Sequence, residues 1–362
     1  MLNRAFLSRQ IQVSTNRMIF ASAGHFLYLD SNGRLYTVGK HARGPSTSTS
    51  SPVACIGNRF YTYITAPSDT ICGINHSNGI FYAYLSNYWG QFGNNTRTDS
   101  SSPVSAVGNH SFVKIFSSVA FGTVYGLKSD GSLWAWGANT CGQLGDNTTN
   151  SRSSPISVLG GHSFVSVAPG SQFVLALKAN GEVWGWGDNA SGQLGQNNIT
   201  NYSTPVKISN HSFIKIAAGE AHSAGIKSDN KCWCWGSNWA GQLGDNSRTN
   251  KSTPISISGG YNFIDISCSY NACHALKSDG SLWAWGYNAD GVIGDNSTTS
   301  RSSPVSVVGN HSFVSISAAY YNCFALKSNG EVWGVGRNDY GQLGDNTRTN
   351  RSSPVSMLGF PR

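Results

Sequence analysis

A short motif, S-[ST]-P-[VI], recurs along this chain at an almost constant interval, and its period limits the possible folds more than any other feature. The motif occurs seven times, 49 to 52 residues apart, with its proline at Pro52, Pro103, Pro155, Pro205, Pro254, Pro304 and Pro354. Periods of this length are typical of solenoids and propellers. No insertion is large enough for a second domain, so we expect one repeat domain at 18–362 after an N-terminal arm at 1–17.

Each unit contains four short segments with the composition of β-strands. In the last unit these are 313–317, 323–327, 331–336 and 354–358. An Asn-Gly or Asp-Gly pair between two such segments is a strong hairpin signal, typical of a type I′ turn. The pair lies between the second and third segments of six units, and the fifth unit has Asp229-Asn230 in its place.

These features predict an all-β protein, a seven-bladed β-propeller with four antiparallel strands per blade. A single blade cannot bury both faces of its sheet, so each blade must pack between two neighbours. Tryptophans two residues apart lie on one face of a strand and supply bulk for this packing. We therefore assign the paired tryptophans to contacts between blades: Trp134/Trp136, Trp184/Trp186, Trp233/Trp235 and Trp283/Trp285.

The composition excludes a disordered chain and favours an acidic partner. Only 12% of residues are charged, but 11 Trp, 15 Tyr and 16 Phe can build a core. The net charge of +8 suits an acidic protein face or an acidic glycan surface, and nucleic acid is possible but not favoured. No apolar run approaches the length of a membrane span, and residues 1–17 lack the apolar core of a secretory signal. We expect no membrane span and a virion-associated or cytoplasmic location.

No pattern typical of an enzyme occurs in the sequence, and we expect a protein without catalytic residues, cofactor or metal. Phosphate-cradling glycine loops, G-x-S-x-G and H-E-x-x-H are absent. Eight cysteines occur without a C-x-x-C pair, which favours buried thiols over a zinc site. Glu220 and His222 are an acid and a base in an atypical loop, and we interpret His222 as structural. Four aspartates that recur with the blades are expected to cap loop amides: Asp146, Asp245, Asp295 and Asp345.

Candidate partner-binding residues gather in the third-to-fourth connections, which antiparallel strands place on one face of the ring. The basic ones are Arg97, Arg152, Arg248, Lys251, Arg301, Arg348 and Arg351. Four of them stand three residues before the motif proline and predict a basic arc, with ordinary solvated charge as the alternative: Arg152, Lys251, Arg301 and Arg351. Aromatic residues at Trp89, Trp239, Tyr287 and Tyr340 suit sugar stacking or a protein hot spot, unless they fold back over a blade. Lysines before the opposite turns are interpreted as aids to solubility.

The repeat resembles that of the regulator of chromosome condensation family. The fifth unit carries the match: 216–222, Trp235-Gly236, Asn238, the G-Q-L-G motif at 241–244, and 252–254. The resemblance covers about 18–359 and implies the propeller. This chain departs from the family's repeat at two places. The first unit lacks G-Q-L-G, and the histidine that the family has in its second strand is kept only as His25 and His222. The other units have Ile71, Thr123, Phe173, Ala272 and Asn322 there.

We expect a non-enzymatic protein-interaction or structural propeller. A component of a larger assembly, such as a virion or surface appendage, would fit this expectation. Units three, six and seven are close copies with a surface rich in Ser, Thr and Asn, a style similar to bacterial and viral members of the repeat class. The alternative is a guanine-nucleotide exchange factor or chromatin-binding regulator, as the resemblance to the founding members implies. As the resemblance implies, their exchange and chromatin-binding activities rest on an inserted wedge-like hairpin and a basic tail, neither of which we find in the sequence.

Overall fold

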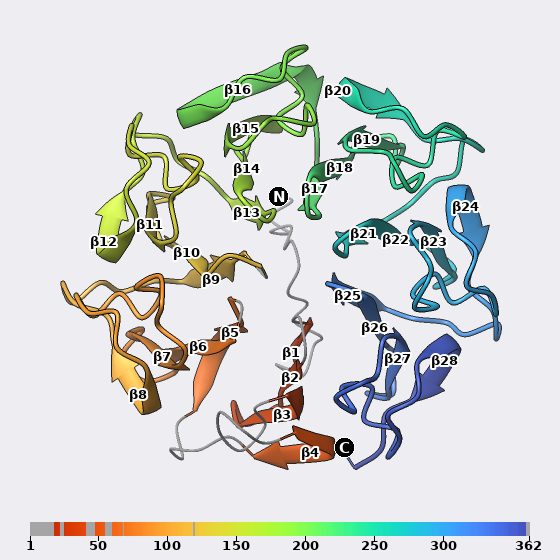
Figure 1. Cartoon of the computed structure of the whole chain (residues 1–362), viewed down its shortest axis with the longest axis horizontal. Helices are drawn as coiled ribbons and strands as arrows, with labels where there is room; N and C mark the ends of the chain where they lie inside the picture. Colours follow the sequence, from red (N-terminus) through yellow and green to blue (C-terminus); the bar gives the residue numbers. More distant parts are fainter. Residues whose placement is uncertain are drawn as a thin grey trace, which may run out of the picture.

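The computed structural model describes residues 18–21, 25–40, 48–54, 60–67, 69–118 and 120–359, and these form strands without any helix. The strands make seven four-stranded sheets arranged around a central axis (Figure 1). Every sheet is antiparallel and uses four strands that are consecutive in the sequence. The seven-bladed propeller predicted from the repeat period is therefore confirmed. The arm predicted at 1–17 lies outside the described residues.

The blades, numbered 1 to 7 along the chain, have equivalent strands at equivalent places. The innermost strands are β1 (Met18–Ala21), β5 (Tyr61–Thr65), β9 (Lys114–Ser117), β13 (Ser166–Pro169), β17 (Lys215–Ala218), β21 (Asp265–Cys268) and β25 (Ser315–Ala319). The second strands are β2 (His25–Leu29), β6 (Thr70–Asn75), β10 (Thr123–Leu127), β14 (Phe173–Leu177), β18 (His222–Ile226), β22 (Ala272–Leu276) and β26 (Asn322–Leu326).

The third and fourth strands complete each blade towards the outer rim. The third strands are β3 (Leu35–Lys40), β7 (Phe81–Leu85), β11 (Leu133–Gly137), β15 (Glu182–Gly187), β19 (Cys232–Gly236), β23 (Leu282–Gly286) and β27 (Val332–Gly336). The fourth strands, which contain the motif proline, are β4 (Ser48–Ala54), β8 (Ser100–Ser105), β12 (Arg152–Ser157), β16 (Tyr202–Ser212), β20 (Lys251–Ser256), β24 (Arg301–Ser306) and β28 (Arg351–Ser356).

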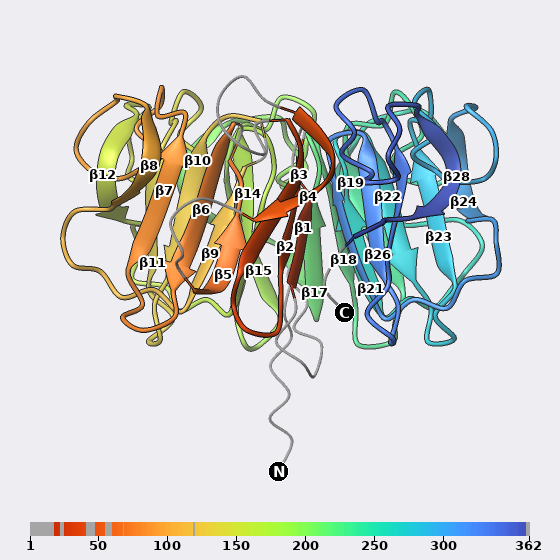
Figure 2. The same cartoon turned by 90° about the horizontal axis from the view of Figure 1, so that it is seen from below.

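The ring has two distinct faces because strand direction alternates within each blade (Figure 2). The loop face, as we call it, carries the first-to-second and third-to-fourth connections of every blade. The turn face carries the second-to-third turns and the links between blades. This division agrees with the sequence-based expectation, and it means that all third-to-fourth loops can contact one partner together.

The turns between second and third strands differ from the predicted type I′ geometry. In blade 3, Gly131 has a φ of 82°, but Asp130 does not take a positive φ. The Asp130 carboxylate instead accepts a hydrogen bond from the Ser132 N–H at 2.8 Å, and the Gly131 N–H donates to the Lys128 carbonyl. This is a three-residue turn that ends in one left-handed residue. In blade 5 that left-handed residue is Asn230, with a φ of 63°.

The second tryptophan of each pair forms the core between two blades, as predicted. Trp136, Trp186, Trp235 and Trp285 are fully buried. Each indole N–H donates to a backbone carbonyl in the G-Q-L-G or G-Q-F-G loop of the preceding blade, at 2.8 to 3.0 Å. The acceptors are the carbonyls of Gln91, Gln143, Gln193 and Gln242.

The first tryptophan of each pair also packs against the core between two blades, as predicted, but it is only partly buried. Trp134 is partly exposed, with the His110 ring 4.1 Å from its own ring and the Lys128 ammonium 4.4 Å from its ring centroid. Burial and the Lys128 charge both lower the pKa of His110, which favours the neutral ring beside the cation. The same Lys–Trp contact recurs in blades 4 to 7. The turn lysines thus cover tryptophans and are not merely solubilising.

A backbone hydrogen bond links each described loop to the outer strand of the next blade. The N–H of an asparagine after the G-Q-L-G motif, or its variants, donates to the carbonyl of the serine two residues before the motif proline. The donor–acceptor pairs are Asn95–Ser153, Asn147–Ser203, Asn197–Ser252, Asn246–Ser302, Asn296–Ser352 and Asn346–Ser50. The last pair closes the ring from blade 7 to blade 1.

Besides the Asn346–Ser50 hydrogen bond, ring closure uses side-chain packing and no exchange of a strand. Blade 7 contains only β25–β28 and blade 1 only β1–β4. The Phe26 and Phe324 rings lie 4.4 Å apart, within a buried cluster that also contains Tyr28 and Leu343. The first and last blades therefore lie side by side in Figure 1 without sharing a sheet.

Replacing Trp235 by Ala should lower the free energy of unfolding by about 3–5 kcal/mol, because it leaves a cavity between blades and removes the bond to the Gln193 carbonyl. Trp233→Ala is the matched control, since Trp233 belongs to the same strand but is partly exposed. Urea unfolding of both variants measures the difference. Equal losses of stability for the two variants would contradict the claim that the fully buried tryptophan of the pair contributes more to the contact between blades.

Candidate interaction surface

Five aromatic side chains from blades 5, 6 and 7 form a continuous line on the loop face, which we call the aromatic strip. Its members are Trp239, Tyr287, Tyr321, Tyr270 and Tyr320. The successive ring centroids lie 5.7, 5.6, 5.7 and 5.0 Å apart. Tyr320 also contacts Tyr321 at 4.7 Å. Such spacings are those of packed aromatic pairs. No comparable line of rings occurs elsewhere among the described residues of the loop face.

The first-to-second connections hold three of these tyrosines near the inner rim. The Glu220 N–H donates to the Tyr270 carbonyl, and the Tyr270 N–H donates to the Tyr320 carbonyl, both at 2.8 Å. These bonds join the equivalent loops of blades 5, 6 and 7. The tyrosine positions are thus fixed by backbone contacts as well as by their own packing.

Tyr320 has a φ of 52°, which places a bulky residue in the left-handed region. Among described non-glycine residues with positive φ, all others except Leu85 are asparagines. Leu85 stands at the place of the glycine that ends the third strand in the other blades. Tyr320 has no such explanation from the repeat. Backbone strain of this kind is concentrated at functional sites, where the surroundings hold it in place.

Two phenols of the strip are held protonated, mainly by burial. Burial and a hydrogen bond with Glu220 raise the pKa of Tyr270, and burial together with the Tyr320 ring raises the pKa of Tyr321 to about 12. Glu220 itself accepts a hydrogen bond at Oε2 from Asn271 Nδ2 at 3.1 Å. Tyr270 and Tyr321 are therefore hydrogen-bond donors at neutral pH and cannot act as bases there.

Trp239 is the most accessible member, with 54% of its surface exposed. The four tyrosines are half-buried. The predicted residue Tyr340 is 38% exposed. Arg337 donates from its backbone N–H to the Tyr321 carbonyl and from Nε to Asp339 Oδ2 at 2.5 Å. A charged pair thus flanks the middle of the strip.

The structure brings together only some of the predicted aromatics. Trp239 and Tyr287 are in contact, whereas Trp89 lies in blade 2 and packs edge-on against Tyr88 at 4.9 Å. Trp89 is half-buried and its ring approaches Gly122 of blade 3, so it folds over the neighbouring blade. The sequence prediction missed Tyr270, Tyr320 and Tyr321. A comparison of the first-to-second turns would have found two of them, since Ser171 and Glu220 occupy the place of Tyr270 and Tyr320.

The four residues of the predicted basic arc begin outer strands instead of lying within loops. Arg152, Lys251, Arg301 and Arg351 are the first residues of β12, β20, β24 and β28. Three of them pair with an aspartate of the same loop: Arg152–Asp146 at 2.9 Å, and Arg301–Asp295 and Arg351–Asp345 at 2.6 Å. Lys251 has no ion-pair partner in the described part of the chain. Much of the arc's charge is therefore neutralised within each blade.

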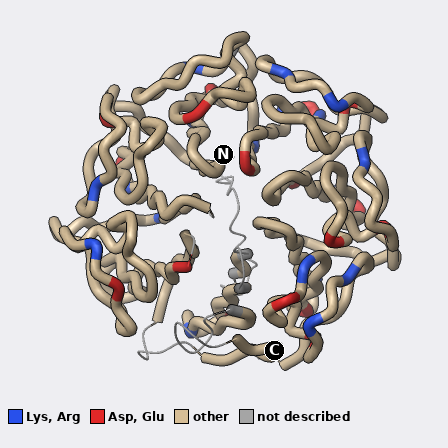
Figure 3. Tube along the Cα trace, in the orientation of Figure 1, with Lys and Arg blue, Asp and Glu red and all other residues tan. Residues whose placement is uncertain are grey.

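The remaining predicted cations are exposed. Arg97, Arg248 and Arg348 all lie in third-to-fourth loops, and Arg348 donates from Nη2 to Ser48 Oγ at 2.9 Å. Figure 3 shows that Lys and Arg are spread around the ring rather than gathered at one blade. A role for these residues in binding stays a prediction.

The repeated aspartates cap loop amides, as predicted. Asp146 accepts hydrogen bonds from the Thr148 N–H and from Asn139 Nδ2, both at 3.1 Å. Burial acts to raise the pKa of Asp146, but the bonds from Thr148 and Arg152 outweigh it, so its pKa lies below the ordinary value. The same balance lowers the pKa of Asp295 and of Asp345.

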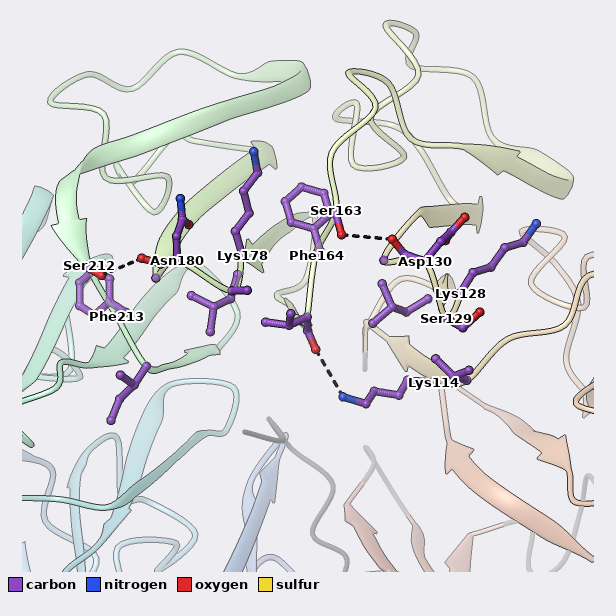
Figure 4. Close-up of a pocket in the computed structure, with 18 residues that line it drawn as sticks. Lys114, Lys128, Ser129, Asp130, Ser163, Phe164, Lys178, Asn180, Ser212 and Phe213 are labelled. Atoms are coloured by element: carbon purple, nitrogen blue, oxygen red, sulfur yellow. Dashed lines mark hydrogen bonds between the residues drawn. The ribbon is translucent and has the colours of Figure 1, made fainter. Parts of the chain in front are cut away.

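A groove of about 600 Å³ lies on the turn face, between blades 3, 4 and 5 (Figure 4). Lys114, Lys128, Lys178 and Phe164 line it, and Ser163 Oγ donates to the Asp130 carbonyl at 3.1 Å. Most of this lining consists of the turn and the Ser-Phe pair that recur in other blades. We favour the aromatic strip as the functional site, because the strip is where the chain departs from its own repeat.

Most described cysteines are buried, as predicted, and Cys141 is the half-buried exception. Cys55 lies outside the described residues. His222 is fully buried beneath the loop that carries Glu220, so this acid and base do not form a solvent-accessible pair. No helix that could cross a membrane occurs in the described ranges.

Seven blades of four antiparallel strands, each built from one repeat, define a repeat propeller. The model of the RCC1-like domain matches residues 6–308, and RCC1 (regulator of chromosome condensation) repeats match 313–342 and 329–362. The chain belongs to the RCC1-like domain family.

Solved structures with the same fold are distant in sequence. Human WBSCR16 is 18% identical with a TM-score of 0.78, covering 87% of this chain and 86% of its own. Yeast RCC1 (Prp20), solved bound to Kap60, is 18% identical with a TM-score of 0.78, covering 99% and 89%. Prp20p of Saccharomyces cerevisiae, described with its binding to Gsp1p and histones, is 18% identical with a TM-score of 0.73, covering 90% and 84%. At this identity the similarity concerns the fold.

Acid should destabilise the ring partly because it protonates the aspartates that cap the loop amides. A carboxyl whose folded pKa is lowered stabilises the fold above its unfolded pKa of about 3.9, and this contribution is lost as pH falls through the folded value. The triple variant Asp146→Asn, Asp295→Asn, Asp345→Asn should therefore show a smaller fall in Tm between about pH 5 and about pH 2 than the wild type. Calorimetry across this range measures the effect. Parallel curves for both proteins would show that these carboxyls titrate alike in the folded and unfolded chains.

Proposed function

We propose that this protein is a non-enzymatic interaction propeller that binds a protein partner through the aromatic strip. The observation that carries the proposal is the strip itself, a line of five contacting rings that interrupts the repeat on the loop face. Tyr and Trp are enriched among the residues that dominate binding energy in protein interfaces.

The packing of the strip favours binding without large rearrangement. The tyrosine rings are held by one another and by the backbone bonds at Glu220 and Tyr270, so little side-chain freedom is lost on docking. Trp239 offers a large exposed ring at one end, and Arg337 with Asp339 offers charge beside Tyr321. An apolar centre with a polar rim is the usual anatomy of a protein interface.

The known structures support a binding role at the level of the fold. One of the similar proteins, yeast RCC1 (Prp20), was solved bound to the protein Kap60. From these proteins we carry over to this chain only the use of the propeller as a platform that binds another protein. A place in a larger assembly, such as a virion or appendage, fits the near-copies of the repeat and the surface rich in Ser, Thr and Asn.

We do not extend the exchange-factor alternative to this chain. All described strands belong to the seven sheets, and no additional hairpin projects from them among the described residues. No observation on the loop face favours nucleotide exchange over simple docking. A catalytic role is likewise not proposed, since the acid Glu220 is hydrogen-bonded and its neighbouring base His222 is buried.

The proposal is tested by comparing two exposed aromatics at equivalent loop positions. A photoreactive residue in place of Trp239, or of Tyr88 in blade 2, should capture a partner from the native source only at the first position. Trp239→Ala should then weaken binding of the identified partner roughly ten- to thirty-fold, the loss typical of a hot-spot residue. Tyr88→Ala should leave the affinity unchanged, although Tyr88 is 69% exposed.

A second variant separates the strip from the predicted basic arc. Arg152→Ser, Lys251→Ser, Arg301→Ser and Arg351→Ser together remove the arc but leave all five rings. If affinity falls in this variant and not in Trp239→Ala, the arc and not the strip is the docking surface. If the arc is the docking surface, added salt should also weaken binding, because exposed charges are screened beyond about 8 Å at physiological ionic strength.

A further inference from the structure

Three groups that can bind metals converge in the interior between blades 5 and 6. Cys273 Sγ lies 2.9 Å from Cys268 Sγ and 3.3 Å from His222 Nε2. The ligand atoms of all three residues lie within 4.8 Å of one another, and all three side chains are buried. Cys268 and Cys273 face each other across β21 and β22, while His222 begins β18 of the preceding blade.

The surroundings of this cluster are apolar and closely packed. Ala217, Ala224, Ile266 and Trp285 belong to the same buried cluster as the two cysteines. A fourth sulfur, that of Cys234 in β19, shares a hydrogen bond with the Cys273 thiol. The His222 ring packs so closely on Gly219 that a side-chain carbon there would meet it at 2.0 Å. Water is thus excluded, and the imidazole is held with Nε2 towards the sulfurs.

We propose that Cys268, Cys273 and His222 bind one Zn²⁺ ion, with Cys234 nearest to the fourth coordination position. Sulfur and imidazole ligands are those that zinc prefers, and closed sites of four such ligands are structural. On binding, each of the two thiols Cys268 and Cys273 releases its proton to solvent and its sulfur lone pair forms a bond to the metal. Two thiolates then neutralise the dication, which suits a site in an apolar interior.

The repeat shows that a buried cysteine at this place does not by itself bring metal-binding groups together. Cys323 occupies in blade 7 the place that Cys273 has in blade 6, and Cys72 has that place in blade 2. Cys323 is equally buried, but its thiol donates to the Phe324 carbonyl, at 3.9 Å. Only between blades 5 and 6 do thiols and an imidazole meet within the described residues.

The position gives the ion a structural role beneath the aromatic strip. Cys268 and Cys273 close the hairpin whose tip carries Tyr270 and Asn271. His222 follows the loop whose Glu220 bonds to that tip. Zinc would therefore join blades 5 and 6 directly under Tyr270, one residue of the strip. The site does not depend on the function proposed above.

The test uses the full chain, stripped with a chelator under reducing conditions and then given Zn²⁺ alone. We expect one equivalent of zinc by native mass spectrometry and a rise in Tm of several degrees. Co²⁺ in place of zinc should give the near-ultraviolet absorption of thiolate bound to cobalt. The variants Cys268→Ser, Cys273→Ser and His222→Ala should each lose most of the binding, and Cys323→Ala should keep it as the matched control.

Several outcomes would overturn the site. They are wild-type protein that takes up no zinc, binding that survives in Cys273→Ser, or a chain that binds Cu⁺ but not Zn²⁺. A mass lower by two hydrogens without metal, reversed by reductant, would show instead that Cys268 and Cys273 form a disulfide. If a variant does not fold, as judged by circular dichroism, the cobalt spectrum of the wild type still decides. A spectrum without the thiolate absorption rejects the proposal.

Discussion

Every blade of this ring depends on hydrogen bonds that it can complete only with its neighbour. The loop asparagine of one blade donates to the outer strand of the next, and in blades 3 to 6 an indole donates back to the loop of the preceding blade. Both acceptors are backbone carbonyls, so the contact tolerates changes of side chain elsewhere. Buried backbone groups without partners are costly, which explains why the G-Q-L-G loop, the tryptophan and the S-[ST]-P motif recur together. The motif that marks the period in the sequence is therefore one half of an interface.

The repeat supplies a uniform scaffold, and departures from it are where specific properties arise. Blades 6 and 7 replace small or polar turn residues by Tyr270 and Tyr320, and the second of these accepts a left-handed backbone. Blades 5 and 6 hold the cluster of His222, Cys268 and Cys273. A ring with many equivalent contacts can absorb such local strain, because each interface is supported independently by its own bonds.

The fold could be predicted from the sequence almost entirely, since the period, the turns and the tryptophans are local signals. The site could be predicted only in part. Trp239 was visible as an aromatic in a loop of small residues, but its contact with Tyr287 joins two blades that are fifty residues apart in the repeat. The ion pair between Arg152 and Asp146 was also missed, although both residues recur at fixed places in the repeat. A pattern of charges in the sequence does not reveal which way the side chains point. The predicted type I′ turn was wrong because the Asp130 carboxylate accepts a hydrogen bond from the Ser132 N–H. This bond stabilises a right-handed backbone conformation at Asp130, before the glycine.

Each sheet is built from four strands that are consecutive in the chain, and the ring closes between blades 7 and 1 by packing and hydrogen bonds without a shared strand. The boundary of the sequence repeat therefore coincides with the boundary of the physical blade. A duplication of one repeat would add a complete sheet with both of its contact surfaces, and a deletion would remove one without leaving an unpaired strand. The number of blades is consequently free to vary during evolution, limited only by the angle at which neighbouring sheets can pack.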